Sequence, residues 1–146
     1  MTVVAEILKS KIDGSVHSIV PTATVLQALQ TMAERRIGAL LVMEGDAIVG
    51  ILTERDYARK IALMGRSSMS TLVSDVMTTA VMYVQPTQTS EECMALMTEN
   101  RLRHLPVVED GAVLGMISIG DLVKDIISEQ QFIIEQMKHY ISGGGR

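Results

Sequence analysis

The sequence repeats itself after 65 residues. Residues 16–60 and 81–125 align without a gap, and 13 of the 45 paired positions are identical. Each copy ends in Gly-apolar-apolar-Thr/Ser-x-x-Asp, which places Asp56 in the first copy and Asp121 in the second. A unit of this size is only marginally stable alone. We therefore expect two similar units that share one core, face each other across a pseudo-twofold axis and bind a ligand in the cleft between them.

The composition argues against several classes of protein. The net charge of −4 and the pI near 5.3 argue against non-specific binding of nucleic acid, which requires a basic surface. No apolar run reaches the roughly 18–20 residues that cross a bilayer, and the first residues do not resemble a signal peptide. Cys93 is the single cysteine, which leaves no disulfide framework and no cysteine-based metal site. We expect a cytoplasmic protein with no metal, no nucleic-acid partner and no membrane segment.

Turn residues, capping boxes and apolar periodicity predict the order β-α-β-β-α in both copies. In the first copy this gives strands at 16–20, 39–43 and 47–52, and helices that begin at Thr24 and, running to about Met64, at Thr53. In the second copy it gives strands at 81–84, 105–108 and 112–117, and helices that begin at Thr89 and Ser118. A short helix leads into each copy, at 3–10 (followed by a turn at Asp13-Gly14) and at 70–76. The predicted domains are 1–67, 68–128, and 129–146 as a helical extension with a Gly-rich tail that begins at Ser142.

Apolar residues recur at seven-residue intervals along the last helix. The two series are Ile119, Ile126, Ile133 and Tyr140, and, between them, Val123, Gln130 and Met137. Three further isoleucines, Ile127, Ile134 and Ile141, widen this seam. Such a pattern is typical of helices that pack against other helices. Packing on its own domain is one interpretation, and a surface for self-association is the one we favour, because the helix is long for so small a domain.

The two Thr/Ser-x-x-Asp segments also allow two interpretations. Thr53 and Ser118 stand at predicted helix starts, where free backbone N–H groups favour an anion. Asp56 and Asp121, three residues later, equally fit as acidic residues of a helix cap that needs no ligand. The spacing alone is compatible with either role.

The doubled motifs resemble a known family. Residues 50–56 and 115–121, together with 101–108, are similar to the signatures of a tandem pair of cystathionine-β-synthase-type (CBS) domains, and the resemblance covers roughly residues 3–128. It implies an α/β (α+β) fold of two β-α-β-β-α repeats and a regulatory function rather than catalysis. Members bind adenosine-containing ligands between the repeats: AMP, ADP or ATP, and in some cases NAD(H) or S-adenosylmethionine. Pairs commonly form disc-like homodimers that regulate an enzyme, channel or transporter, which here would be a separate protein.

The resemblance assigns roles to residues at both motifs. Asp56 and Asp121 are expected to bind the ribose, because a carboxylate can accept hydrogen bonds from both ribose hydroxyls. Thr53 and Ser118 are expected near the ribose or phosphate, and Ile51 and Met116 beside the adenine. Backbone groups near His17, Ser18, Met82 and Tyr83 are expected to meet the edge of the base.

The resemblance also implies that the two sites differ in phosphate contacts, which come partly from the opposite copy. The Asp56 site is expected to receive Arg103 and His104, whereas Gly120 adds no charge there. The Asp121 site is expected to receive Arg55, assisted by Arg59 one turn later, whereas Gly38 and Ala39 add none.

These observations predict a stand-alone sensor of adenine nucleotides that relays its ligand state to a separate protein. S-adenosylmethionine is less favoured than AMP, ADP, ATP or NAD(H). The alternative is a structural homodimerisation module without ligand dependence. No catalytic or metal-binding residues are predicted, because the sequence contains no Ser-His-Asp set, no Walker loop and no metal cluster.

Overall fold

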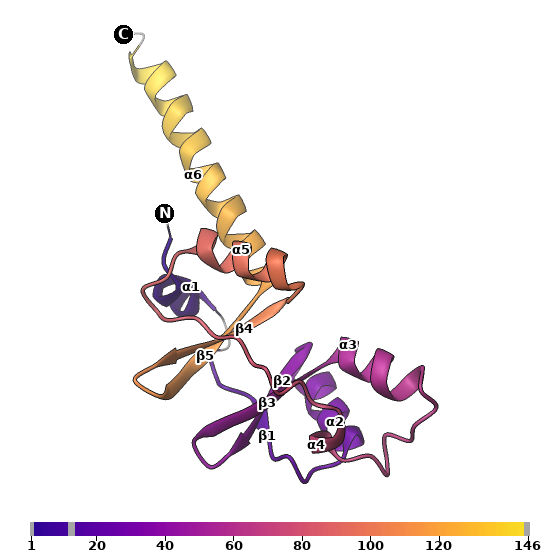
Figure 1. Cartoon of the computed structure of the whole chain (residues 1–146). Coiled ribbons are helices and arrows are strands. Elements are labelled where there is room, and N and C mark those ends of the chain that lie inside the picture. The colour runs from indigo at the N-terminus through magenta and orange to yellow at the C-terminus, as the bar shows by residue number, and fades with distance from the viewer. Residues whose placement is uncertain (1, 12–13, 145–146) are drawn as a thin grey trace. The chain divides into compact units, whose positions relative to one another are not determined.

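The computed structural model describes residues 2–11 and 14–144, and the chain divides into two compact units (Figure 1). The Asp56 unit is formed by Ser15–Tyr83 and Asp110–Leu114. The Asp121 unit is formed by the chain up to Gly14, by Val84–Glu109 and by the chain from Gly115 onward. Each unit therefore contains one motif aspartate and most of one sequence repeat.

The Asp56 unit contains a three-stranded sheet of order β1-β2-β3. Its elements are β1 (Ser18–Ile19), α2 (Val25–Arg35), β2 (Ala39–Glu44), β3 (Ala47–Thr53), α3 (Glu54–Asp56), the π-helix η1 (Tyr57–Ala62) and α4 (Val73–Val76). Strand β1 runs parallel to β2, and β2 runs antiparallel to β3. The first four residues of β2 are buried, as their continuous apolar run predicts.

The Asp121 unit repeats part of this plan with fewer paired strands. Its elements are α1 (Val4–Ser10), α5 (Ser90–Asn100), β4 (His104–Glu109), the part of β5 (Ala112–Ser118) from Gly115 onward, and α6 (Ile119–Gly144), and β4 pairs with β5. The strand predicted at 81–84 is wrong, because only Val84 forms a bridge, to Val107. Met82 and Tyr83 are exposed, so they bury no apolar side chain that would hold a longer strand against β4.

Capping boxes begin the first long helix of both repeats, as predicted. The Gln27 N–H donates to Thr24 Oγ1 at 3.2 Å, and the Thr24 N–H donates to Gln27 Oε1 at 2.9 Å. Thr89 and Glu92 form the same reciprocal pair at the start of α5. Both helices also end in the same way, on an arginine in the left-handed region, at Arg36 and Arg101.

The short leading helices pack against the repeat that they do not precede in the sequence. In α1, the Val4 N–H donates to Gln88 O at 2.8 Å, and Val4 is fully buried in the Asp121 unit. In α4, the Val73 N–H donates to Ala23 O at 2.8 Å, and Val73 is fully buried in the Asp56 unit. The expectation that residues 3–10 enter the first copy and 70–76 the second therefore holds for chain order but not for packing.

The buried apolar side chains form two clusters, one in each unit. One cluster surrounds Leu105, Ile117 and Leu122 in the Asp121 unit, and the other surrounds Leu40 and Leu52 in the Asp56 unit. These clusters describe each unit by itself, and the expectation of one shared core stays a prediction. Helices α1 and α4 each supply apolar residues to the cluster of the unit that they join.

The helices that follow the two motifs differ. The first was predicted to be one helix from Thr53 to about Met64, but only Glu54–Asp56 is α-helical before the π-helix begins, and the Leu63 N–H bonds to Ala58 O. The second, α6, stays α-helical over 26 residues to Gly144. The predicted stop at Ser142 is therefore wrong, because a glycine near a helix end costs only about 1 kcal/mol. Gly145 and Arg146 lie outside the described residues.

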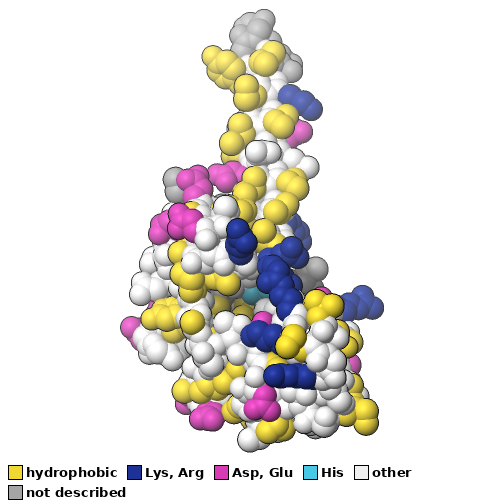
Figure 2. Space-filling view, turned by 45° about the vertical axis from the view of Figure 1, so that its right-hand side comes forward, with side chains coloured by type: hydrophobic (Ala, Val, Ile, Leu, Met, Phe, Trp, Pro, Cys, Tyr) yellow, Lys and Arg dark blue, Asp and Glu magenta, His cyan; other side chains and the backbone are white. Residues whose placement is uncertain are grey.

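Helix α6 extends beyond the other elements of its own unit (Figure 1). The side chains described from residue 130 to residue 141 are all exposed. Figure 2 shows apolar side chains along this extension, which gives an exposed apolar surface on a single helix.

Candidate functional site

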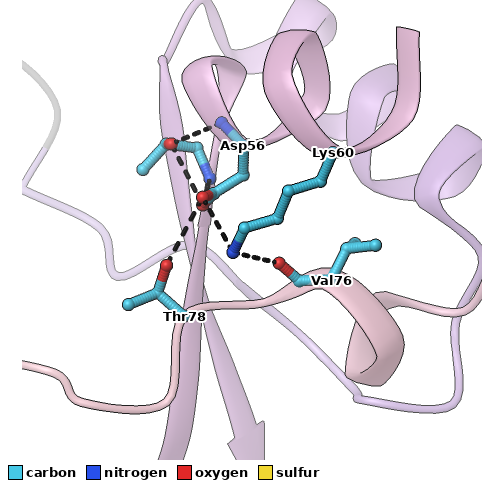
Figure 3. Close-up of polar contacts among 5 residues, drawn as sticks. Asp56, Lys60, Val76 and Thr78 are labelled. Atoms are coloured by element: carbon cyan, nitrogen blue, oxygen red, sulfur yellow. Dashed lines mark hydrogen bonds and ion pairs between the residues drawn. The ribbon is translucent and has the colours of Figure 1, made fainter. Parts of the chain in front are cut away.

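Asp56 forms a capping box with Thr53 at the start of α3, the helix that follows β3 (Figure 3). Its Oδ2 accepts hydrogen bonds from the Thr53 N–H at 3.0 Å and from Thr53 Oγ1 at 3.1 Å. The Asp56 N–H in turn donates to Thr53 Oγ1 at 3.1 Å. The capping role that the spacing allowed for Thr53 and Asp56 is therefore confirmed.

The second oxygen of Asp56 is also occupied. The Lys60 ammonium lies 3.3 Å from Oδ1, and the Thr78 hydroxyl donates to the same oxygen at 3.4 Å. Lys60 also donates to Val76 O at 2.8 Å, which ties the carboxylate to the end of α4. Because the Asp56 side chain is only 13% exposed, a ribose hydroxyl would have to replace one of these partners.

Asp121 and Ser118 form a similar reciprocal pair of hydrogen bonds at the start of α6. Its Oδ2 accepts from the Ser118 N–H at 2.8 Å, and the Asp121 N–H donates to Ser118 Oγ at 3.1 Å. The Lys11 ammonium lies 3.0 Å from the same oxygen and donates to Met116 O at 2.7 Å. Both of these contacts of the carboxylate involve Oδ2, so a hydroxyl that donates to Oδ1 would displace neither of them.

The charges around Asp121 determine its protonation. Burial alone raises the pKa of the carboxyl, but hydrogen bonds from the Ser118 N–H and from Lys11 outweigh it, so the pKa lies below its ordinary value. The carboxylate is therefore fully ionised at neutral pH, and each of its oxygens is able to accept hydrogen bonds.

His104 belongs to the same electrostatic group. Burial is the main cause that lowers its pKa, the positive charge of Lys11 lowers it further, and the negative charge of Asp121 acts in the opposite direction. His104 is therefore a neutral imidazole at neutral pH, able to donate one hydrogen bond and accept another.

The structure places the other predicted site residues in one unit or the other. His17, Ser18, Ile51, Arg55, Arg59, Met82 and Tyr83 belong to the Asp56 unit, and Arg103, His104 and Met116 to the Asp121 unit. Arg59 and Arg103 are exposed, whereas Ile51 is buried and its backbone pairs with Thr78. The phosphate contacts expected from Arg103 and His104 at Asp56, and from Arg55 and Arg59 at Asp121, stay predictions.

Sequence reasoning missed the two lysines that neutralise the motif aspartates. Lys60 follows Asp56 by four residues, a spacing that places two side chains on one helix face and could have predicted the pair. Lys11 lies far from Asp121 in the sequence, and no local pattern joins them. Thr78 was missed for the same reason, since it follows α4 and reaches Asp56 only through the fold.

Other kinds of site find little support in the described part of the chain. Over residues 2–11 and 14–144, no three His, Cys, Asp or Glu side chains are grouped so that they could hold a metal ion. The same residues contain no helix of the length and apolar character needed to span a bilayer. Cys93 is buried within α5.

Comparisons with known proteins agree with the doubled architecture. The family model for the CBS domain matches residues 4–63 and again residues 73–128. The solved structure of a CBS-domain protein from Burkholderia ambifaria is 54% identical, with a TM-score of 0.85 over 88% of this chain and 96% of that one. The mitochondrial CBS domain-containing protein CBSX3 of Arabidopsis thaliana is 41% identical over 98% of this chain and 73% of its own length.

A hexameric CBS-CP12 protein from bloom-forming cyanobacteria is also similar in structure. It is 25% identical, with a TM-score of 0.75 over 97% of this chain and 83% of that one. Since the family model covers most of the sequence in two successive matches, the chain belongs to the CBS-domain family and carries two CBS domains in tandem.

Proposed function

We propose that this protein is a regulatory sensor that binds an adenosine-containing ligand at its motif aspartates and relays the bound state to a separate protein. AMP, ADP, ATP and NAD(H) are the favoured ligands, ahead of S-adenosylmethionine. The observation that carries the proposal is the ionised carboxylate of Asp121, which the Ser118 N–H and Lys11 hold at a helix start through Oδ2. Such a group suits the paired hydroxyls of a ribose.

The two aspartates differ in how readily each can bind a ribose. At Asp121, a hydroxyl adds to Oδ1, and the hydroxyl of Ser118 and the backbone of Met116 lie beside it. At Asp56, the same step displaces Lys60 or Thr78 from Oδ1. We therefore expect the Asp121 site to bind the ligand more tightly and to fill first.

Thermal unfolding with a panel of AMP, ADP, ATP, NADH and S-adenosylmethionine tests the proposal. At a ligand concentration of 100 times Kd the free energy of unfolding rises by about 2.7 kcal/mol, which corresponds to roughly 5–10 °C in Tm. Absence of any shift across the panel would remove the sensor function. Mass spectrometry of small molecules released from the purified protein would identify a ligand that co-purifies.

Two substitutions then assign the sites. Asp121→Ala is expected to abolish most of the ligand-induced shift, and Asp56→Ala to reduce it less. Both variants lose a helix cap, so the quantity compared is the shift caused by ligand and not the Tm itself. Asp46→Ala, which removes an exposed carboxylate from a hairpin turn, is the matched control and should keep the full shift. An equal loss in the two motif variants would contradict the ranking.

We also propose a cytoplasmic location for this protein. A reduced cytoplasm suits the single buried cysteine, although the plant relative is mitochondrial. We propose no turnover, no nucleic-acid partner and no membrane association for this chain.

A second candidate is a homodimerisation module that acts without ligand. It is favoured by the extension of α6, where Ile133, Met137 and Ile141 are each at least half exposed. The relative from cyanobacteria is hexameric, so assembly occurs within the family. Sedimentation at micromolar concentration, with and without nucleotide, tests this candidate, and a monomer in both conditions would contradict it.

A further inference from the structure

Helix α6 carries an exposed apolar surface that its own unit does not cover. Beyond Gln130, every side chain described on this helix is exposed, including Phe132 at 64% and Tyr140 at 77%. An isolated helix with this much exposed apolar surface is unusual for a protein that works as a monomer. We therefore expect another protein segment to pack on this surface, and the sequence of the helix limits what that segment can be.

The exposed residues fit a heptad pattern whose letters follow from their spacing. Ile119, Ile126, Ile133 and Tyr140 take position d, and Val123, Gln130 and Met137 take position a. Ile127, Ile134 and Ile141 then take position e, whereas Glu129 and Gln136 take position g. The a and d positions form the seam of a coiled coil, and the e and g positions set the orientation of the partner.

The flanking positions favour an antiparallel partner with the same sequence. In a parallel pair, position g of one helix faces position e of the other, so Glu129 would lie against Ile134. In an antiparallel pair, e faces e and g faces g, so Ile127 meets Ile134 and Glu129 meets Gln136. The antiparallel arrangement thus pairs apolar with apolar and polar with polar, and it brings no like charges together.

One antiparallel register uses the whole extension. Pairing Val123 with Tyr140 also pairs Ile126 with Met137 and Gln130 with Ile133, because each a residue then meets a d residue. The local dyad falls between Gln130 and Ile133, so the two copies of Gln130 flank it. A single polar residue in such a seam is a known means of fixing register.

We propose that the occupant of this surface is α6 of a second copy of the chain, packed antiparallel with Val123 of one copy beside Tyr140 of the other. The proposal rests on the self-association of the second candidate function and does not depend on nucleotide binding. It specifies which residues of the two copies meet.

Disulfide trapping distinguishes the arrangements. Val123→Cys and Tyr140→Cys are prepared separately, on chains of distinguishable mass, and oxidised alone or mixed. In the proposed register the two copies of residue 123 lie about 26 Å apart along the helix axis, so neither variant should cross-link with itself, and the mixture should. The native Cys93 is buried, and burial followed by the charge of Glu92 raises the pKa of its thiol, so it should not compete.

A matched pair of substitutions tests the surface itself. Ile133→Lys lies in the seam and should weaken dimerisation at least 100-fold, whereas Gln131→Lys, exposed on the outer face, should change it less than about 3-fold. Circular dichroism and the nucleotide-induced Tm shift of both variants should match the parent, because neither residue belongs to a core cluster. If the unsubstituted protein shows no nucleotide-induced Tm shift, the sensor proposal is refuted, but the proposed helix pair is not affected.

Three outcomes would overturn the antiparallel pair. Self-cross-linking of Val123→Cys would show a parallel arrangement. A monomer in sedimentation at micromolar concentration would show that the surface has no copy of the chain on it. A tetramer would show that more than one helix covers the seam.

Discussion

The two motif aspartates occupy equivalent positions in their repeats, yet they are neutralised in different ways. Asp56 receives Lys60 from the next turn of its own helix, whereas Asp121 receives Lys11 from the end of α1. At the position equivalent to Lys60 the second repeat carries Asp125, whose Oδ2 is buried without a hydrogen-bond partner in the described structure. Once this position holds a carboxylate, the cation must come from another element.

The difference shows how a duplicated sequence can produce unequal sites. The same two reciprocal hydrogen bonds join the Thr or Ser to the Asp of the motif in both repeats. The side-chain environment differs, because one lysine is local and the other depends on tertiary packing. A ligand at Asp56 therefore competes with Lys60 for Oδ1, whereas at Asp121 the lysine lies on Oδ2.

The largest expected difference concerns the motif glycines, Gly50 and Gly115. A Cβ on Gly50 would lie 2.6 Å from Met77 Sδ and 3.0 Å from Thr78 O, whereas on Gly115 it would lie 2.9 Å from the tip of Leu8. A backbone carbonyl cannot move aside as a leucine tip can. Gly50→Ala is therefore expected to lower the free energy of unfolding by about 2–3 kcal/mol and Gly115→Ala by about 1 kcal/mol. Urea denaturation measures both, and equal losses would contradict this explanation.

The lysines give the next largest contrast. The Lys11 side chain is 26% exposed and that of Lys60 41%, so the Lys11 pair is less well screened by water. Lys11→Met is expected to cost about 1–2 kcal/mol and Lys60→Met about 0.5 kcal/mol. A double-mutant cycle with Asp121→Asn or Asp56→Asn isolates each pair, and a larger coupling energy at Lys60 would refute the contrast.

What the sequence could predict in these two regions was local. The capping boxes at Thr24 and Thr89, the hairpin turns and most strands follow from patterns within a few residues, and the structure confirms them. The exchange of α1 and α4 could not be predicted, because an apolar stripe does not specify which repeat it packs against. The Lys11–Asp121 contact depends on that exchange and was missed with it.

The capping boxes provide a comparison in which the two units should behave alike. Thr24→Ala and Thr89→Ala each remove the hydroxyl that accepts from the third residue of the helix. Each is expected to cost about 1 kcal/mol, with the two values within error of one another. Thr98→Ala is the control, because this hydroxyl only donates to Met94 O within α5 and its loss should change stability little. A markedly larger cost at one cap would show that the repeats differ in local structure as well.

The smallest expected effect is a dependence on pH that arises from the Asp121 unit. Burial, with help from Lys11, lowers the pKa of His104 below its ordinary value of 6.5, so the unfolded chain binds a proton first as the pH falls. His104 therefore contributes stability that is fully present above pH 6.5 and is lost as the pH falls through the lowered pKa of the folded state. Asp121, whose pKa is also lowered, acts in the same direction, but only once the pH falls toward its ordinary value of 3.8.

Urea denaturation between pH 8 and about pH 5 isolates the histidine, because the aspartate remains ionised over that range. His104→Gln should flatten the decline in unfolding free energy below pH 6.5, whereas His139→Gln, on the exposed part of α6, should leave it unchanged. If the decline persists in His104→Gln, the proton is taken up elsewhere. The grouping of His104 with Lys11 and Asp121 would then not control the acid response of this unit.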